Sequence, residues 1–157
     1  MKIQIWTIGK EDEVYIKAGV EDFTKRISRY FGAEWIIIPP PKNSNKLPIA
    51  EAKKKEGEMI SSMLKKDDYL VVLDEKGKTM TSQKLANFIQ SRANESVKQL
   101  VFLIGGAYGI DGEVLRRANY CLSLSEFTFP HQLVRLILAE QIYRACTIIR
   151  KEKYHHD

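Results

Sequence analysis

Residues 99–135 constrain the fold more than any other part of the chain. An apolar run at 100–104 ends abruptly at two consecutive glycines, and a second run at 120–124 ends in the sequence Ser-Glu-Phe-Thr-Phe-Pro. Short apolar runs bounded by turn residues are typical of buried β-strands. The segment therefore predicts two strand ends that open into two loops, just before the last long helix of the chain.

Similar short runs recur along the whole sequence and alternate with helix-length segments. The expected strands are residues 2–8, 33–38, 69–73, 100–104 and 120–124. The expected helices are residues 11–31, 47–66, 81–92 and 130–151, with a very short one after Gly109. Either Thr81 or Ser82 is the candidate N-cap of the third of these, and Thr128 that of the last. This order predicts an α/β fold with a mainly parallel sheet and helices on both faces.

Composition limits the number of domains and the compartment. With 157 residues, 44% of them hydrophobic, the chain can form one core, and we expect a single domain over residues 1–157. No apolar run reaches membrane-spanning length, and the start has no signal-like apolar core, so we expect a cytoplasmic protein with no membrane partner. The net charge of +5 is compatible with a nucleic-acid partner but does not identify one.

The last helix carries more apolar residues than one packing face can cover. Leucine, isoleucine, valine, alanine and cysteine occur almost all around it between residues 133 and 149. Such a helix packs on its own sheet with one side and on something else with the other, most economically a second copy of the chain. We therefore expect a homodimer. The alternative is a central helix that is buried within one subunit.

A ligand site is expected where the strands end, because ligands of parallel sheets bind beyond their carboxyl ends. The sequence Gly-Gly-Ala-Tyr-Gly at 105–109 would let backbone amides approach a ligand. It lacks the glycine order of a dinucleotide fingerprint, although Glu126 stands about where that fingerprint has its acid, and no Gly-Lys-Ser/Thr of a phosphate loop follows. What remains is a shallow apolar pocket suited to an adenosine-like ligand.

Other site chemistries find little support in the sequence. No serine lies in a Gly-x-Ser-x-Gly motif, which argues against a serine hydrolase triad. The His155–His156 pair has no cysteine or third histidine nearby, so no metal site is expected. Cys121 and Cys146 lie far apart in apolar patterns, which favours buried, reduced thiols.

A set of motifs spread over the whole chain resembles a known family. They are Leu-Asp-x-x-Gly-Lys at 73–78, Ser82-Gln83 with Leu85-Ala86, Phe-x-Ile-Gly-Gly-Ala-Tyr-Gly at 102–109, Leu-Ser-x-Ser at 122–125, Thr-Phe-Pro-His-Gln at 128–132 and Tyr154-His155. In combination they closely resemble the large-subunit ribosomal RNA methyltransferase H family of the SPOUT class. The resemblance implies a SPOUT-type α/β knot, with a trefoil knot at the C-terminal end, and a homodimer.

The same resemblance implies the activity and the cofactor. The family transfers a methyl group from S-adenosyl-L-methionine to N3 of a pseudouridine in 23S ribosomal RNA, on the assembled ribosome. Its cofactor residues correspond here to Leu73, Gly105, Leu124, Ser125, Glu126, Phe127, Thr128 and Phe129. In this light Glu126 is a loop residue that contributes backbone, and no metal is required.

Candidate catalytic residues lie at the two ends of the last helix. His131 and Arg135 share one helix face near its start, and Tyr154 and His155 belong to the tail. We expect them to orient the base or to stabilise charge on its carbonyl oxygens, the tail acting in the partner's pocket. A capping role for His131, an intersubunit ion pair for Arg135 and simple packing for Tyr154 are the structural alternatives.

The sequence offers several candidate RNA contacts and two alternative functions. The candidate phosphate contacts are Lys10, Lys17, Lys25, Arg26, Arg29, Arg116 and Arg117. A non-catalytic module that binds an adenosine ligand or RNA, and a nicotinamide-linked oxidoreductase, are the alternatives to the methyltransferase.

Overall fold

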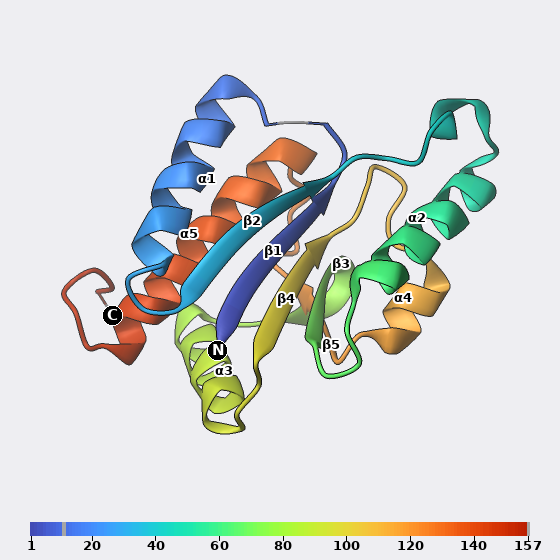
Figure 1. Cartoon of the computed structure of the whole chain (residues 1–157). Helices are drawn as coiled ribbons and strands as arrows, with labels where there is room; N and C mark the ends of the chain where they lie inside the picture. Colours follow the sequence, from blue (N-terminus) through green and yellow to red (C-terminus); the bar gives the residue numbers. More distant parts are fainter. Residues whose placement is uncertain (11, 157) are drawn as a thin grey trace.

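Five parallel strands form one twisted sheet in the order β2-β1-β4-β3-β5 (Figure 1). The computed structural model describes residues 1–10 and 12–156. The strands are β1 (Lys2–Ile8), β2 (Gly32–Ile38), β3 (Tyr69–Thr79), β4 (Gln99–Ile104) and β5 (Tyr120–Ser123). The helices are α1 (Val14–Ile27), η1 (Ser44–Lys46), α2 (Ile49–Met63), α3 (Ser82–Asn94), α4 (Gly112–Arg117) and α5 (His131–Ile149).

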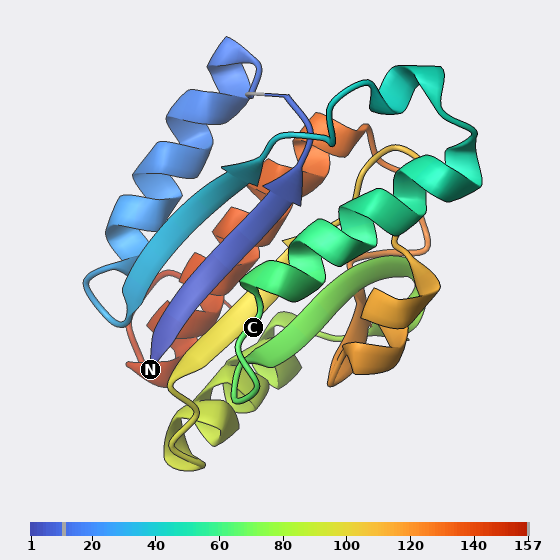
Figure 2. The same cartoon turned by 45° about the vertical axis from the view of Figure 1, so that its right-hand side comes forward.

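Successive side chains along each strand point to opposite faces of the sheet, so the core has two layers. In β4, Phe102 packs with α1, α3 and α5 on one face of the sheet, whereas Leu103 packs with α2 and α4 on the other. Figure 2 shows α2 and α4 in front of the sheet and α5 behind it. The prediction of a parallel sheet covered on both faces is therefore confirmed.

Strand β3 is longer than the sequence predicts. The sequence predicts an end at Leu73, but the strand resumes pairing at Lys78, where Leu122 of β5 is opposite both Leu73 and Lys78. The intervening residues bulge out of the register, and the Asp74 side chain accepts a 2.8 Å hydrogen bond from the Lys76 amide within the bulge. Residues 74–77 thus interrupt the pairing, but the sheet continues beyond them.

The two predicted N-caps have different outcomes. The Thr81 hydroxyl accepts a 3.1 Å hydrogen bond from the Lys84 amide and caps α3, as expected. Thr128 does not cap α5, because Pro130 occupies the N-cap position and makes no side-chain cap bond. Thr128 instead lies in the loop before α5, which borders the cavity described below.

Helix α5 lies between α1 and α3 against the sheet (Figure 1). Leu138 and Ile142 are fully buried on its inner side. On its outer side, four residues spaced at i, i+4, i+7 and i+11 are only half-buried: Leu133, Ile137, Glu140 and Arg144. One chain therefore leaves an outer stripe on α5, defined by these four residues, partly exposed.

Candidate functional site

A cavity of about 560 Å³ opens where β3, β4 and β5 end. Its walls come from the bulge of β3, from the glycine loop 105–110 after β4 and from the loop 124–130 between β5 and α5. All eight residues that the family resemblance assigns to the cofactor line it: Leu73, Gly105, Leu124, Ser125, Glu126, Phe127, Thr128 and Phe129. Parallel topology brings these three strand ends to one edge, as the sequence predicts.

The glycine loop is folded tightly onto itself. A Cβ atom on Gly105 would lie 2.4 Å from the Ile110 side chain, so residue 105 has no room for a side chain while Ile110 keeps its place. Gly106 forms a bridge to Gly109, whose φ of +82° suits glycine. At its three glycines the loop thus presents backbone to the cavity, and Tyr108 and Ile110 add side chains to the wall.

The loop between β5 and α5 is held by two serines. The Ser123 hydroxyl donates to the Ser125 carbonyl at 3.0 Å, and the Ser125 hydroxyl accepts from the Phe127 amide at 3.0 Å. Both bonds close short turns, which typically fix the backbone of serine-rich loops. The Phe127 side chain is left 81% exposed at the cavity wall.

His131 lies at the inner end of the cavity, in the first turn of α5. Burial, and next the positive charge of Arg135, lower the pKa of His131, while a hydrogen bond with the Gly105 backbone acts in the opposite direction. Among the described residues its Nε2 atom is buried without a hydrogen-bond partner. Burial and the neighbouring guanidinium therefore favour the neutral form of the imidazole beside the glycine loop.

Arg135 is not part of the cavity wall. Its side chain is 1% exposed and forms an ion pair of 2.7 Å with Asp12, whose side chain is 4% exposed. The structure thus places the guanidinium inside the subunit, on the loop after β1. This differs from the expected direct contact with the RNA base, and also from an intersubunit ion pair.

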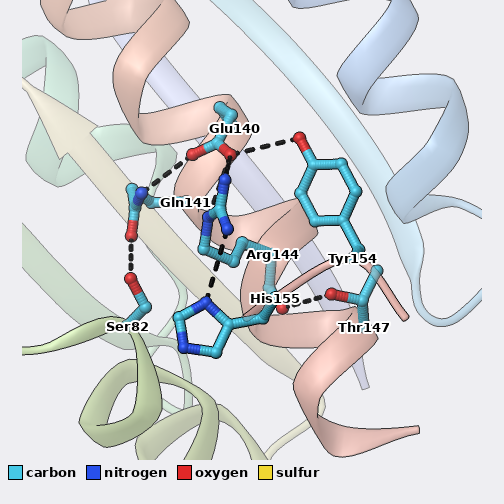
Figure 3. Close-up of polar contacts among 7 residues, drawn as sticks. All are labelled: Ser82, Glu140, Gln141, Arg144, Thr147, Tyr154 and His155. Carbon is cyan, nitrogen blue, oxygen red and sulfur yellow. Dashed lines mark hydrogen bonds and ion pairs between the residues drawn. The ribbon is translucent and has the colours of Figure 1, made fainter. Parts of the chain in front are cut away.

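The tail packs on the C-terminal half of α5. The Tyr154 hydroxyl donates to Glu140 Oε1 at 3.2 Å, and Arg144 Nη1 donates to His155 Nδ1 at 3.3 Å (Figure 3). The Tyr154 ring also meets Tyr143 edge-on, with 4.8 Å between centroids. Burial, with the neighbouring Glu140 carboxylate, raises the pKa of Tyr154, which keeps its hydroxyl a donor.

The tail and the cavity of one chain lie at opposite ends of α5. Arg144 follows His131 by 13 residues, which corresponds to roughly 20 Å along a helix. A second anchor at the far end is the Tyr30 hydroxyl, which donates to Glu152 at 2.5 Å; burial and this carboxylate raise the pKa of Tyr30 to about 12. The four predicted catalytic residues are therefore not brought together within one chain.

Sequence reasoning missed three cavity residues, Glu75, Ile110 and Val134. Asp74 and Tyr108 also line the cavity, as expected from the strand end after Leu73 and from the glycine loop, and Tyr108 is 63% exposed. Glu75 belongs to the bulge of β3, and its only signal is its position just after a strand end. Glu56 of α2 approaches the outside of the glycine loop, within 3.2 Å of a Cβ built on Gly106, and burial raises its pKa.

These walls suit S-adenosylmethionine in size and charge. The volume falls within the ~300–1,000 Å³ of small-molecule sites. Leu73, Ile110 and Val134 offer apolar surface to an adenosine, and Glu75 and Glu126 offer negative charge to a sulfonium or ammonium group. The glycine loop adds backbone donors and acceptors, because its glycines leave the backbone uncovered.

The basic residues considered as RNA contacts have unequal surroundings. Arg117 donates to the carbonyls of Lys65, Lys66 and Asp68, at 3.2, 3.3 and 2.9 Å, and so holds the turn between α2 and β3. Arg116 pairs with Glu113 on the surface of α4. A structural role thus accounts for Arg117.

The described residues form neither a metal-ion site nor a membrane-spanning helix. Over residues 1–10 and 12–156, no group of three or more histidine, cysteine or acidic side chains is placed to hold a metal ion. Within the same residues, no helix has both the length and the apolar character needed to cross a membrane.

Comparisons with known proteins identify the family. A model described as a predicted SPOUT methyltransferase matches residues 1–155. Proteins named ribosomal RNA large subunit methyltransferase H are 48% identical over 156 residues in Cytophaga hutchinsonii (99% of this chain, 100% of the relative) and 43% identical over 157 in Parabacteroides distasonis (100% of both). A solved probable methylase family protein from Haemophilus influenzae shares the fold, with a TM-score of 0.52 and 10% identity over 99% of this chain and 70% of its own. The chain belongs to the SPOUT methyltransferase family.

Proposed function

We propose that this chain is a methyltransferase that uses S-adenosylmethionine to methylate N3 of a pseudouridine in 23S ribosomal RNA, on the assembled ribosome. One observation carries the proposal: three chain segments far apart in sequence meet around one cavity with all eight expected cofactor residues in its wall. Full-length relatives bear the name of a large-subunit ribosomal RNA methyltransferase. Such a substrate implies a cytoplasmic enzyme.

Alignment should dominate the chemistry. When bound, the cofactor would supply a methyl group that is already activated as a sulfonium. As the N3–CH3 bond forms, the S–CH3 bond breaks and the N3 proton is released to bulk solvent. The chain's part is to hold the acceptor nitrogen in line and to exclude water. His131, whose pKa is lowered by burial at the cavity wall, is suited to orient the base or to stabilise charge on a carbonyl oxygen.

The tail acts, in this proposal, on the cavity of a second copy. Two chains that pack through the outer stripe of α5 in antiparallel orientation would bring the tail of one beside the α5 N-terminus of the other. The 19 residues of α5 span roughly 28 Å, enough for both cavities to form at the two ends of one interface. Tyr154 and His155 would then complete the partner's site.

Labelled S-adenosylmethionine and three substrates test the function. The substrates are ribosomes that lack the methyl group, free 23S RNA with pseudouridine and the same RNA with uridine. We expect transfer to ribosomes, with the label on the pseudouridine base. Transfer to none of the three, with S-adenosylhomocysteine still bound, would contradict the proposal and favour a non-catalytic adenosine-binding module; stabilisation by NAD instead would favour an oxidoreductase.

A further inference from the structure

A buried ion pair ties the loop after β1 to the first two turns of α5. The Arg135 guanidinium donates from Nη1 to Asp12 Oδ1 at 2.7 Å and to the Lys10 carbonyl at 3.0 Å. One turn earlier, the Gln132 side chain accepts a 3.1 Å hydrogen bond from the Glu13 amide. The N-terminal ends of α1 and α5 are thus joined through two α5 side chains.

The loop is fitted closely to the guanidinium. A Cβ atom on Gly9 would lie 3.3 Å from Arg135 Nη2, and Gly9 has a φ of +134°, which side chains rarely adopt. Arg135 Nε is buried with no partner among the described residues. The site therefore holds the arginine in one orientation but does not use all of its donors.

Stability alone is a poor explanation for this pair. The desolvation penalty is several kcal/mol for each buried ion, and well-packed apolar residues in place of a buried pair are often equally stable or more so. Both side chains are almost fully buried, at 1% and 4% exposure. What the charged pair adds is a fixed geometry between two segments, through directional, charge-assisted bonds.

That geometry extends directly to the cavity. His131 precedes Arg135 by one helical turn on the same inner face of α5, and it lines the cavity beside Gly105. The loop 124–130, which forms another wall, runs into the same turn. Any rotation or shift of the first turn of α5 moves both walls.

We propose that Asp12 and Arg135 are positioning residues for methyl transfer: their buried pair fixes the first turns of α5, and with them His131, at the cavity wall. Neither side chain contacts cofactor or RNA. The inference rests on the proposed function, because it concerns the reaction in that cavity.

Three variants separate positioning from simple stabilisation. Asp12→Asn and Arg135→Lys each keep most of the packing, and the double variant Asp12→Leu/Arg135→Met replaces the charges by apolar side chains of similar size. We expect kcat for methyl transfer to fall about 10- to 100-fold in each, because small displacements at a reacting centre have effects of that order. KM for the ribosome should change little. The double variant should keep the melting temperature of the wild type but not its kcat.

The pKa of His131, measured by NMR titration, is a second readout. A purely structural role of the ion pair does not predict the opposite shifts expected for the following two variants. Arg135→Met removes a positive charge beside the ring and should raise the pKa of His131. Asp12→Asn leaves that charge without its partner and should lower the same pKa. Asp22→Asn is the matched control, because Asp22 pairs with Arg26 on the exposed face of α1 and should affect neither kcat nor the histidine.

The outcomes are distinguishable. A double variant with wild-type kcat would overturn the inference and leave the pair a packing device. An unchanged His131 pKa in both Asp12→Asn and Arg135→Met would overturn it as well, whether or not ribosomes are the substrate. If the wild type itself methylates no ribosomal substrate, the proposed function fails, and the opposite pKa shifts still test whether the pair sets the His131 environment.

Discussion

At the scale of single residues, Gly105 shows how little space the cavity wall leaves. A Cβ atom there would overlap Ile110, itself part of the wall, so even alanine must displace the loop. The conflict of a larger side chain at residue 105 therefore lies within the loop itself and does not require a bound ligand.

Replacement of Gly105 by alanine should therefore weaken cofactor binding without unfolding the chain. Overpacking of this kind costs about 1–3 kcal/mol, which corresponds to roughly a 10- to 100-fold loss of affinity if the loop bears it. Titration calorimetry with S-adenosylhomocysteine measures the loss. Gly112→Ala is the control, because a Cβ there meets only ordinary contact at 3.6 Å. Wild-type affinity in Gly105→Ala would show that the loop does not contact the cofactor.

His131 should make stability depend on pH in a defined direction. Its pKa is lowered in the folded chain, so below the unfolded value of about 6.5 the unfolded chain binds the proton more readily. The contribution of His131 is fully present above that pH and is lost as the pH falls toward the folded pKa. Urea unfolding from pH 8 to 5, for the wild type and His131→Gln, should show a difference that shrinks on acidification. A difference that grows would contradict the shift.

At the scale of elements, the tail depends on α5 for its conformation. Glu140 accepts from both Arg144 and Tyr154, and Gln141 links Glu140 to Ser82 of α3 (Figure 3). The tail is thus connected to two helices through one carboxylate. A segment anchored in this way can present side chains in a fixed direction.

Tyr154→Ala should separate catalysis from cofactor binding. It removes the hydroxyl bond to Glu140 and the ring contact with Tyr143, both far from the cavity of the same chain. We expect methyl transfer to ribosomes to fall at least about tenfold, the usual scale for loss of a positioned group, while the affinity for S-adenosylhomocysteine stays within about twofold. Lys153→Ala, an exposed neighbour, serves as the control. Parallel losses of activity and affinity in Tyr154→Ala would indicate that the tail only supports the fold.

At the scale of the whole molecule, the outer stripe of α5 is the surface on which the proposed dimer depends. Ile137→Glu places a charge at its centre, and burying an unpaired charge in an interface costs several kcal/mol. Sedimentation velocity should show a monomer for this variant and a dimer for the wild type. Ile49→Glu, at a 53% exposed position of α2 in the opposite layer, should remain a dimer. A dimeric Ile137→Glu variant would place the interface elsewhere.

Such a monomer also separates two properties of the cavity. The cofactor walls come from one chain, so cofactor affinity should survive the loss of the dimer. The tail would no longer reach a partner's cavity, so methyl transfer should be lost. This combination is expected only if the active site is shared between subunits.

Local signals in the sequence predicted the strands and the cavity edge, because apolar runs and turn residues act over a few positions. Leu100 to Ile104 could be recognised as a buried strand without knowledge of its neighbours, and the glycines after it mark where it ends. The eight cofactor positions came from the family resemblance and needed only the motifs. Arg135 was misplaced because its partner, Asp12, is 123 residues away and carries no local signal.

The sequence by itself therefore determined the alternation of strands and helices, the parallel sheet with two covered faces and the edge at which a ligand would bind. Periodicity and turn chemistry depend on neighbouring residues, and these are present in the sequence. Only the tertiary structure decided that β3 continues past its bulge, that Arg135 is held inside the subunit, that Arg117 holds the turn before β3 and that the tail of one chain lies a helix length from its own cavity. Each of these depends on contacts between distant segments, which form only when the chain is packed.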